Sequence, residues 1–211
     1  ATAAVAGPGL ESPSCTVLAA SVSTTVPSLQ PETVTVTVDH TVYLCASSTY
    51  SWVDSAGGTN LGLGDDQRLS VTLPFSFDFY GATYSSLYVS SNGLLIFGTN
   101  DGLLDSNNFT IPTLTQPNNF IAPAWDDWDP SAGGAVITKT VGSAPNRTWV
   151  ITWQGVPRYT NLGGTAPATF QAILDEATDR VTFQYNTMYL ANGAYNNGIS
   201  ATAGVEDAAG L

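Results

Sequence analysis

The stretch Val71-Thr72-Leu73-Pro74-Phe75-Ser76-Phe77-Asp78-Phe79-Tyr80-Gly81 alternates apolar and polar side chains. As far as Phe79, the odd positions carry Val, Leu and Phe, and the even positions up to Tyr80 carry Thr, Pro, Ser, Asp and Tyr. Because successive side chains of a β-strand point to opposite faces, this period predicts a strand with one face in a hydrophobic core. Tyr80-Gly81 is expected to end that strand.

Two further apolar runs follow, from Ser86 to Ser91 and from Leu94 to Phe97, with Asn92-Gly93 between them. Asn and Gly tolerate positive φ, so this dipeptide between apolar runs is a strong signal for a β-hairpin. The sequence therefore predicts a β-sheet protein.

The composition indicates an unusual surface. The chain has 211 residues, of which 43% are hydrophobic and only 10% are charged. That length suits one large β domain, or one domain with an extension. The polar surface must then consist mainly of Thr, Ser, Asn, Gln and Gly. Such a surface occurs on extracellular proteins and assemblies, and we expect a secreted or cell-surface protein.

The charge balance excludes two kinds of partner. Acidic residues outnumber basic ones by 17 to 5, and the formal net charge is −12. Five bases cannot form the clustered basic surface that nucleic acids or anionic membranes require. No apolar run approaches the ~20 residues of a membrane-spanning helix, so we expect no membrane span. An acidic surface attracts cations, which makes calcium a possible cofactor.

Two cysteines, Cys15 and Cys45, flank segments rich in Thr and Val. In a secreted protein a disulfide between them is expected, and on the chain-entropy estimate it would stabilise the fold by ~3–4 kcal/mol. The alternative is a pair of free, buried cysteines.

Residues 1–49 are expected to form an N-terminal extension, and residues 50–211 the main domain. Residues 33–44 of the extension alternate cleanly and indicate either one long strand or two strands bent near Asp39-His40. One predicted face of this run consists of Val34, Val36, Val38, His40, Val42 and Leu44.

The main domain contains about ten short strand candidates and no helical periodicity. Residues 149–153 and 170–174 alternate, as do residues 181–185, and the polar connection 175–180 predicts a hairpin between the last two runs. Many short strands joined by Gly- and Pro-rich turns indicate a β-sandwich of the jelly-roll kind. The predicted fold class is therefore all-β, with an extended β segment at the N-terminus.

A set of motifs occurs in a fixed order along the main domain. They are Trp52-Val53-Asp54-Ser55, Asp65-Asp66, Leu73-Pro74-Phe75-Ser76-Phe77, Phe79-Tyr80-Gly81, Val89-Ser90-Ser91-Asn92-Gly93, Ile121-Ala122-Pro123-Ala124-Trp125-Asp126-Asp127, Thr169-Phe170-Gln171 and Ala203-Gly204-Val205-Glu206-Asp207. This order resembles a β-sandwich module of secreted bacterial proteins, found beside subtilisin-like peptidases and in large surface proteins. It is also distantly similar to the nidogen-type extracellular domain. The resemblance covers roughly residues 50–207 and implies an extracellular, non-catalytic module without a known ligand.

Histidine-based catalysis and zinc binding find no support in the sequence. His40 is the only histidine, and its neighbour Asp39 would point to the opposite face of a strand. A catalytic triad needs a carboxylate that holds the histidine, and a zinc site needs more His or Cys ligands than this chain supplies.

Asp126, Asp127 and Asp129 lie between Trp125, Trp128 and Pro130 and allow three interpretations. The carboxylates could cap backbone N–H groups in a turn, bind calcium, or act as the paired acids of a glycosidase. Neighbouring acids in one short loop do not usually straddle a substrate, which argues against catalysis. Asp65-Asp66 allows the same interpretations, with more weight on a structural turn.

Trp52 and Trp128 are expected in loops and are the candidates for ligand binding, with packing as the alternative. Trp149 and Trp153 share a strand face that is expected in the core. Asn108-Phe109-Thr110 and Asn146-Arg147-Thr148 match the N-glycosylation pattern, and Asn108 and Asn146 are the candidate acceptors.

Three functions remain. The first is a non-catalytic subunit of a surface filament or layer, in which residues 33–44 add to a sheet of the next copy in head-to-tail contacts. The alternative for this segment is to complete its own sandwich. The second function is an accessory module of a secreted hydrolase that binds polysaccharide or a cell-surface protein through Trp52 and Trp128. The third is a glycosidase that uses the acids at 126–129.

Overall fold

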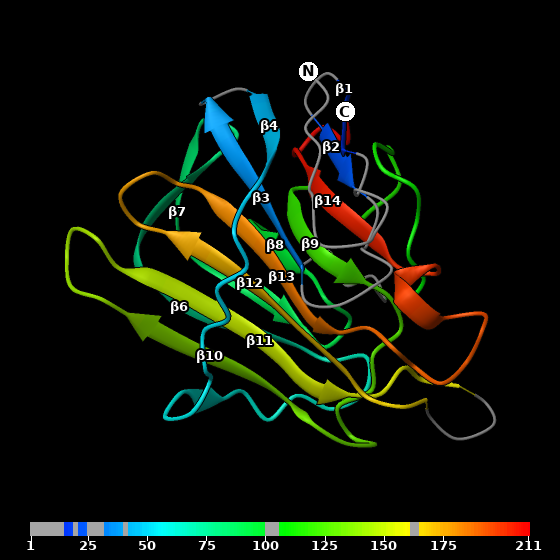
Figure 1. The fold of residues 1–211 in the computed structure, drawn as a ribbon. Coiled ribbons are helices and arrows are strands. Elements are labelled where there is room, and N and C mark those ends of the chain that lie inside the picture. The colour runs from blue at the N-terminus through cyan, green and yellow to red at the C-terminus, as the bar shows by residue number, and fades with distance from the viewer. Residues whose placement is uncertain (1–14, 19–20, 25–31, 40–41, 100–105, 161–164) are drawn as a thin grey trace.

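Two antiparallel sheets pack face to face in the computed structural model, as Figure 1 shows. The structure describes residues 15–18, 21–24, 32–39, 42–99, 106–160 and 165–211, and in its four N-terminal strands the side chains of Tyr43, Cys45 and Ala46 only. The predicted all-β sandwich is confirmed. None of the described residues forms a helix long and apolar enough to cross a membrane.

Each sheet has seven strands. Sheet A contains, in spatial order, β1 (Cys15–Leu18), β2 (Ser21–Thr24), β14 (Thr202–Glu206), β9 (Phe120–Trp125), β8 (Leu95–Phe97), β7 (Ala82–Ser90) and β6 (Arg68–Phe79). Sheet B contains β4 (Val42–Ser47), β3 (Glu32–Asp39), β13 (Val181–Thr187), β12 (Ala168–Asp175), β11 (Thr148–Val156), β10 (Ala135–Val141) and β5 (Thr59–Asn60). One turn of 3-10 helix, η1 (Asn196–Gly198), precedes β14.

The stretch from Val71 to Gly81 forms the greater part of β6 and its turn, as predicted. Leu73 and the three following odd residues of β6 are buried, while the even residues between them are exposed or partly exposed. Tyr80 and Gly81 have φ of 47° and 78° and reverse the chain into β7, because Phe79 pairs with Ala82. Among the described residues β6 pairs only with β7, so Pro74 lies in an edge strand, where its missing N–H is tolerated.

Aromatic side chains fill the space between the sheets. Trp153 and Phe170 from sheet B stack with ring centroids 5.1 Å apart, and Trp128 packs on the same Phe170. The indole Nε1 of Trp153 donates to the carbonyls of Ser90, the last residue of β7 in sheet A, and of Ser91, at 3.0 and 2.9 Å. This buried donor is therefore satisfied across the two layers, and the predicted core position of Trp153 is confirmed.

The N-terminal strands continue both sheets. Asp39 pairs with Val42, so residues 33–44 form two strands, the second of the two alternatives. The register places Val36 opposite Cys45 and Val38 opposite Tyr43, and Tyr43 and Cys45 are buried. Residues 33–44 therefore form two paired strands and not one continuous alternating run.

β3 pairs with β13 on one side and with β4 on the other, all within one chain. β3 therefore has no free edge to add to another sheet, whereas β4 lies at the edge of sheet B, so addition of this segment to another copy stays a prediction. Val34, Val36 and Val38 lie in β3, and Val42 and Leu44 lie in β4, whereas His40 lies outside the described residues. The domain boundary between residues 49 and 50 stays a prediction.

A strap, residues 50–56, crosses the outer face of sheet B and runs over several of its strands (Figure 1). The side-chain amide of Gln184 in β13 bonds to the backbone N–H and C=O of Ser51, and Gln171 in β12 bonds in the same way to those of Val53. Ser55 Oγ donates to Gln154 of β11. The two buried glutamines thus supply the hydrogen bonds that a neighbouring strand would make.

Candidate functional site

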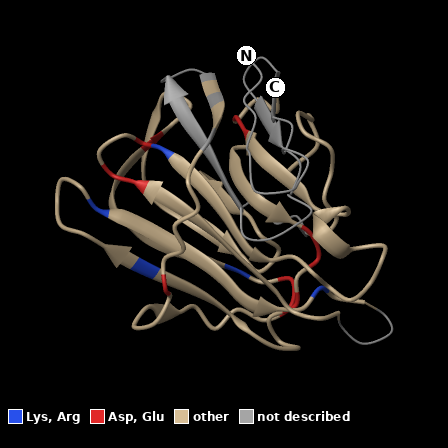
Figure 2. Cartoon of the chain, in the orientation of Figure 1, with Lys and Arg blue, Asp and Glu red and all other residues tan. Residues whose placement is uncertain are grey.

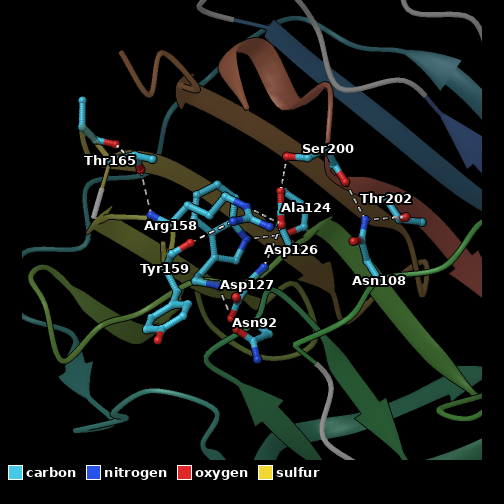
Figure 3. Close-up of polar contacts among 12 residues, drawn as sticks. Asn92, Asn108, Ala124, Asp126, Asp127, Arg158, Tyr159, Thr165, Ser200 and Thr202 are labelled. Carbon is cyan, nitrogen blue, oxygen red and sulfur yellow. Dashed lines mark hydrogen bonds and ion pairs between the residues drawn. The ribbon is translucent and has the colours of Figure 1, made fainter. Parts of the chain in front are cut away.

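Loops from both sheets meet where β9 and β11 end and β14 begins (Figure 3). The segment after β9 supplies Asp126, Asp127 and Trp128, and the segment after β11 supplies Arg158 and Tyr159. Asp126 and Arg158 are joined by an ion pair, and the loop before β14 reaches it through Ser200. We call this part of the molecule the loop end. Figure 2 shows acidic segments grouped there beside one basic segment.

Both carboxylate oxygens of Asp126 accept hydrogen bonds from other parts of the chain. Its side chain is only 1% exposed, and its Oδ1 accepts from Nε of Arg158 at 2.7 Å and from the backbone N of Asp127 at 2.9 Å. Its Oδ2 accepts from the hydroxyl of Ser200. A carboxylate with these partners is not free to act as a general acid or as a nucleophile, which removes the main support for the glycosidase hypothesis.

Arg158 links the neighbouring loops. Its guanidinium carbon lies 4.0 Å from the ring centroid of Tyr195, and its Nη1 donates to the carbonyl of Tyr159 at 2.8 Å. Its backbone N donates to Oγ1 of Thr165 at 2.9 Å. One arginine therefore fixes segments that precede β12 and β14 against the segment that follows β9.

Asp129 caps a turn, as one of the sequence interpretations expected. Its Oδ1 accepts from the backbone N of Ser131 at 2.9 Å and from that of Ala132 at 3.2 Å. Asp126 and Asp129 therefore have structural partners, and the predicted grouping of Asp126, Asp127 and Asp129 is not the one that the fold brings together.

The fold instead brings Asp127 next to Asp65 and Asp66. Each of the three offers a carboxylate oxygen, and these oxygens lie within 4.8 Å of one another. Burial and the charge of Asp66 raise the pKa of Asp127 to about 6, although Arg158 acts in the opposite direction. Burial, then Asp129 and Asp66, raise the pKa of Asp65. Oxygen ligands suit calcium. If the chain binds calcium, we expect the ion at these three acids, and calcium binding stays a prediction.

Asn92 of the predicted Asn-Gly turn joins these acids to Trp128. Its Oδ1 accepts from the backbone N of Trp128 at 2.8 Å, and its Nδ2 donates to Asp66 at 2.8 Å. A Cβ on Gly93 would lie 2.1 Å from the carbonyl oxygen of Ala124, and φ at Gly93 is +79°. Only glycine fits there, so the turn signal also marks a close approach between loops.

Trp128 is fully buried, and the prediction that it binds a ligand is wrong. Its Nε1 donates to the carbonyl of Ala124 at 2.7 Å, and its ring packs on Phe170. Trp52 lies on the strap, is partly exposed, and stacks on Tyr50 with centroids 6.3 Å apart. Ligand binding by Trp52 therefore stays a prediction.

Three exposed side chains lie on the loops that follow β11 and precede β14, and the sequence did not indicate them. Tyr159 is 40% exposed, Tyr189 63% and Ile199 73%. Tyr189 is held near Asn197, because the backbone N of Asn197 donates to the carbonyl of Met188 at 2.8 Å. Ile199 directly precedes Ser200, the partner of Asp126. Each lies outside a regular apolar pattern, so no periodicity could have indicated it.

The remaining candidates lie away from the loop end or take part in packing. Cys45 is buried, and no described cysteine carries a free thiol. The side chain of Cys15 lies outside the described residues, so the disulfide stays a prediction. Asn108 packs against the start of β14, whereas Asn146 is exposed between β10 and β11. A polar pocket beside Lys139 and Trp149 has no acidic residue in its lining.

The fold and the loop end define a β-sandwich module in which Asp126 and Asp129 hold loops in place. The family model for NIDO-related domains matches residues 42–211, and the chain belongs to that family. This confirms the distant resemblance to the nidogen-type domain. An origin in bacteria and an association with subtilisin-like peptidases stay predictions.

One curated relative is Dendrite extension defective protein 1 of Caenorhabditis elegans, which is 25% identical over 195 residues. The match covers 83% of this chain and 16% of that protein, so the chain spans about a sixth of this relative's length. No solved structure matches the chain.

Proposed function

We propose that this chain is a non-catalytic module of an extracellular protein and that it binds another protein through the loop end. Membership of the NIDO-related family and the low-charge surface support the extracellular location. The structural use of Asp126 and Asp129 supports the absence of catalysis.

The exposure of Tyr159, Tyr189 and Ile199, on the loops that follow β11 and precede β14, is the observation that carries this proposal. Exposed apolar side chains grouped on one surface mark interaction sites, and Tyr is among the residues that contribute most to protein interfaces. The Asp126–Arg158 pair holds the loops that bear them. A surface fixed before binding loses less entropy when a partner docks.

Fluorescently labelled chain, applied to cells and extracellular matrix of the source organism, tests the proposal. The double variant Tyr189→Ser/Ile199→Ser should lower binding at least ~10-fold, because each buried apolar side chain contributes about 1–3 kcal/mol. Treating the surface with a protease should abolish binding, and treating it with glycosidases should not.

The control is the double variant Leu69→Ser/Val141→Ser. It removes two exposed apolar side chains, 43% and 39% exposed, that lie in β6 and β10, away from the loop end. Equal loss of binding in both double variants would contradict the proposal, and so would binding that resists protease and is lost on glycosidase treatment.

Self-association into a filament or layer is the second candidate. Among the described residues the outer edge of β6 is unpaired, and no charged residue occurs from Leu69 to Phe77. Edge strands are normally protected by charge, proline or a bulge, and here Pro74 and the bulge between Thr72 and Phe77 protect only the middle. Sedimentation velocity over a wide concentration range should show growing species that Val71→Lys abolishes. A single monomeric species at every concentration would exclude this candidate.

The carbohydrate-binding alternative now depends on Trp52 alone. If the Tyr50–Trp52 stack on the strap binds a sugar, retention on insoluble polysaccharides should be lost in Trp52→Ala and kept in Tyr189→Ser. No retention of the unchanged chain on any such polymer would dismiss this alternative.

A further inference from the structure

The two N-glycosylation patterns have very different surroundings in the folded chain. Asn146 lies in the turn between β10 and β11, where its side chain is exposed and makes no hydrogen bond to another described residue. Its backbone N donates to the carbonyl of Ser143 at 2.9 Å, so the turn itself is held in place. Thr148, the third residue of the pattern, begins β11.

Asn108, in contrast, is part of the packing at the loop end, as Figure 3 shows. Its Nδ2 donates to the carbonyl of Ser200 at 2.6 Å and to Oγ1 of Thr202 at 3.0 Å. Oγ1 of Thr202 donates in turn to the carbonyl of Phe109 at 2.7 Å. Both hydrogens of the Asn108 amide are therefore in use, and its nitrogen faces the start of β14.

We propose that Asn146 is an acceptor of an N-linked oligosaccharide and that Asn108 is not. The donor is an oligosaccharide joined through pyrophosphate to a polyisoprenoid lipid. The amide nitrogen of Asn146 forms a bond to C1 of the first sugar, the bond from C1 to the pyrophosphate oxygen breaks, and the nitrogen gives up one proton. The glycosylated amide keeps one hydrogen. No hydrogen bond of the fold is lost at Asn146, because its side chain makes none to another described residue.

The same transfer at Asn108 would remove one of its two hydrogen bonds and place a sugar where Ser200 and Thr202 lie. The loop that carries Ser200 could then not reach Asp126. Chains glycosylated at Asn108 would fail to close this part of the sandwich, so they would be absent from the folded, secreted protein.

The position of Asn146 has a consequence for binding. Asn146 and Arg158 lie beyond opposite ends of β11, a strand of nine residues, so about 30 Å separate them at ~3.3 Å per residue. Figure 1 shows the β10–β11 turn and the loop after β11 at opposite ends of that strand. A glycan on Asn146 therefore covers the turn end of the sandwich and leaves the loop end open.

Site-resolved glycopeptide mass spectrometry tests the proposal. The full chain is secreted from eukaryotic cells that perform N-glycosylation, and the monomeric fraction is treated with peptide-N-glycosidase in heavy-oxygen water, which converts each glycosylated Asn into labelled Asp. We expect label at Asn146 and none at Asn108. Asn146→Gln and Thr148→Val should each remove the glycan from the whole protein.

Thr110→Val is the matched control, because it destroys the other pattern while it leaves Asn108 and its hydrogen bonds in place. The glycan should persist in this variant at the level of the unchanged chain. Asn108→Gln should also keep the glycan, and it should reduce the amount secreted. Label at Asn108 in secreted monomer, or secreted monomer in which Asn146 is unlabelled, would overturn the proposal. Neither result depends on what the loop end binds.

Discussion

Asp126 and Asp127 are neighbours in the chain, but their carboxylates have different surroundings. The carboxylate of Asp126 points inward to Arg158 and Ser200, whereas that of Asp127 lies near Asp65 and Asp66. The sequence showed that acids gather at 126–129, and it correctly offered a turn cap for Asp129. It could not show which acid meets an arginine 32 residues further along, because that meeting depends on how β9 and β11 pack in different sheets.

Removing one partner of the buried ion pair should destabilise the chain strongly. Arg158→Met leaves the Asp126 carboxylate buried without its counter-charge, and we expect a loss of about 3–5 kcal/mol in the free energy of unfolding, measured in urea. The double variant Asp126→Asn/Arg158→Met should recover part of that loss. Arg147→Met removes a more exposed pair with Glu176 and should change stability far less. An equal effect of the two arginine substitutions would contradict the role of Arg158.

The calcium prediction is tested at the three grouped acids. If Asp65, Asp66 and Asp127 bind calcium, adding the ion should raise the melting temperature, because a ligand that binds only the folded state stabilises it. Asp127→Asn should remove most of this rise, and Asp54→Asn, at an exposed turn, should keep it. Calcium titration followed by calorimetry measures both. A rise of the same size in both variants would assign the effect to general screening of charge.

Glu206 should make stability depend on pH. Burial raises its pKa from 4.5 to about 7, with Asp207 adding to the rise and the backbone N of Thr113 opposing it. Between these values the folded state binds more protons than the unfolded state, so the free energy of unfolding falls as the pH rises from 4.5 to 7. Glu206→Gln should flatten this slope in urea denaturation at several pH values. An unchanged slope would show that other groups cause it.

At the scale of elements, local sequence patterns predicted where the strands lie, but they did not predict which other segments pack beside those strands. Alternation indicated β6, β11, β12 and β13, and the polar segment 175–180 indicated the hairpin that joins the last two. The strap was missed, since Gln171 and Gln184 look like solvent-facing residues of a strand. Both are buried because the strap covers them. The sequence of either strand cannot indicate this contact, because the strap lies more than 100 residues earlier in the chain.

The strap should open locally when one of its glutamines loses its amide. Gln171→Met keeps the volume of the side chain and removes both bonds to Val53, so hydrogen exchange at the Val53 amide should accelerate at least ~10-fold, equivalent to about 1.4 kcal/mol. Exchange within β11 and β12 should stay slow. Gln154→Met, which removes the bond from β11 to Ser55 further along the strap, is the control and should leave the Val53 amide protected. Faster exchange across all of sheet B would indicate global destabilisation instead.

At the scale of the whole molecule, the N-terminal strands tie the two layers together. β1 and β2 extend sheet A, β3 and β4 extend sheet B, and β4 contacts both β1 and β2 across the sandwich. The sequence predicted a disulfide and an extension separately. Because Cys15 begins β1 and Cys45 lies in β4, a bond between them would join the two sheets at the end where their N-terminal strands meet.

This bond should stabilise the molecule mainly through the unfolded state. Closing a loop of about 30 residues removes chain entropy worth ~3–4 kcal/mol, so reduction, or the double variant Cys15→Ser/Cys45→Ser, should lower the free energy of unfolding by about that amount. Thiol titration of the unfolded chain should find no free thiol before reduction. The urea dependence of unfolding should steepen after reduction, since an uncrosslinked chain exposes more surface when it unfolds. Free thiols in the native protein, with a stability that reducing agent does not change, would show that the sandwich holds its two layers by packing alone.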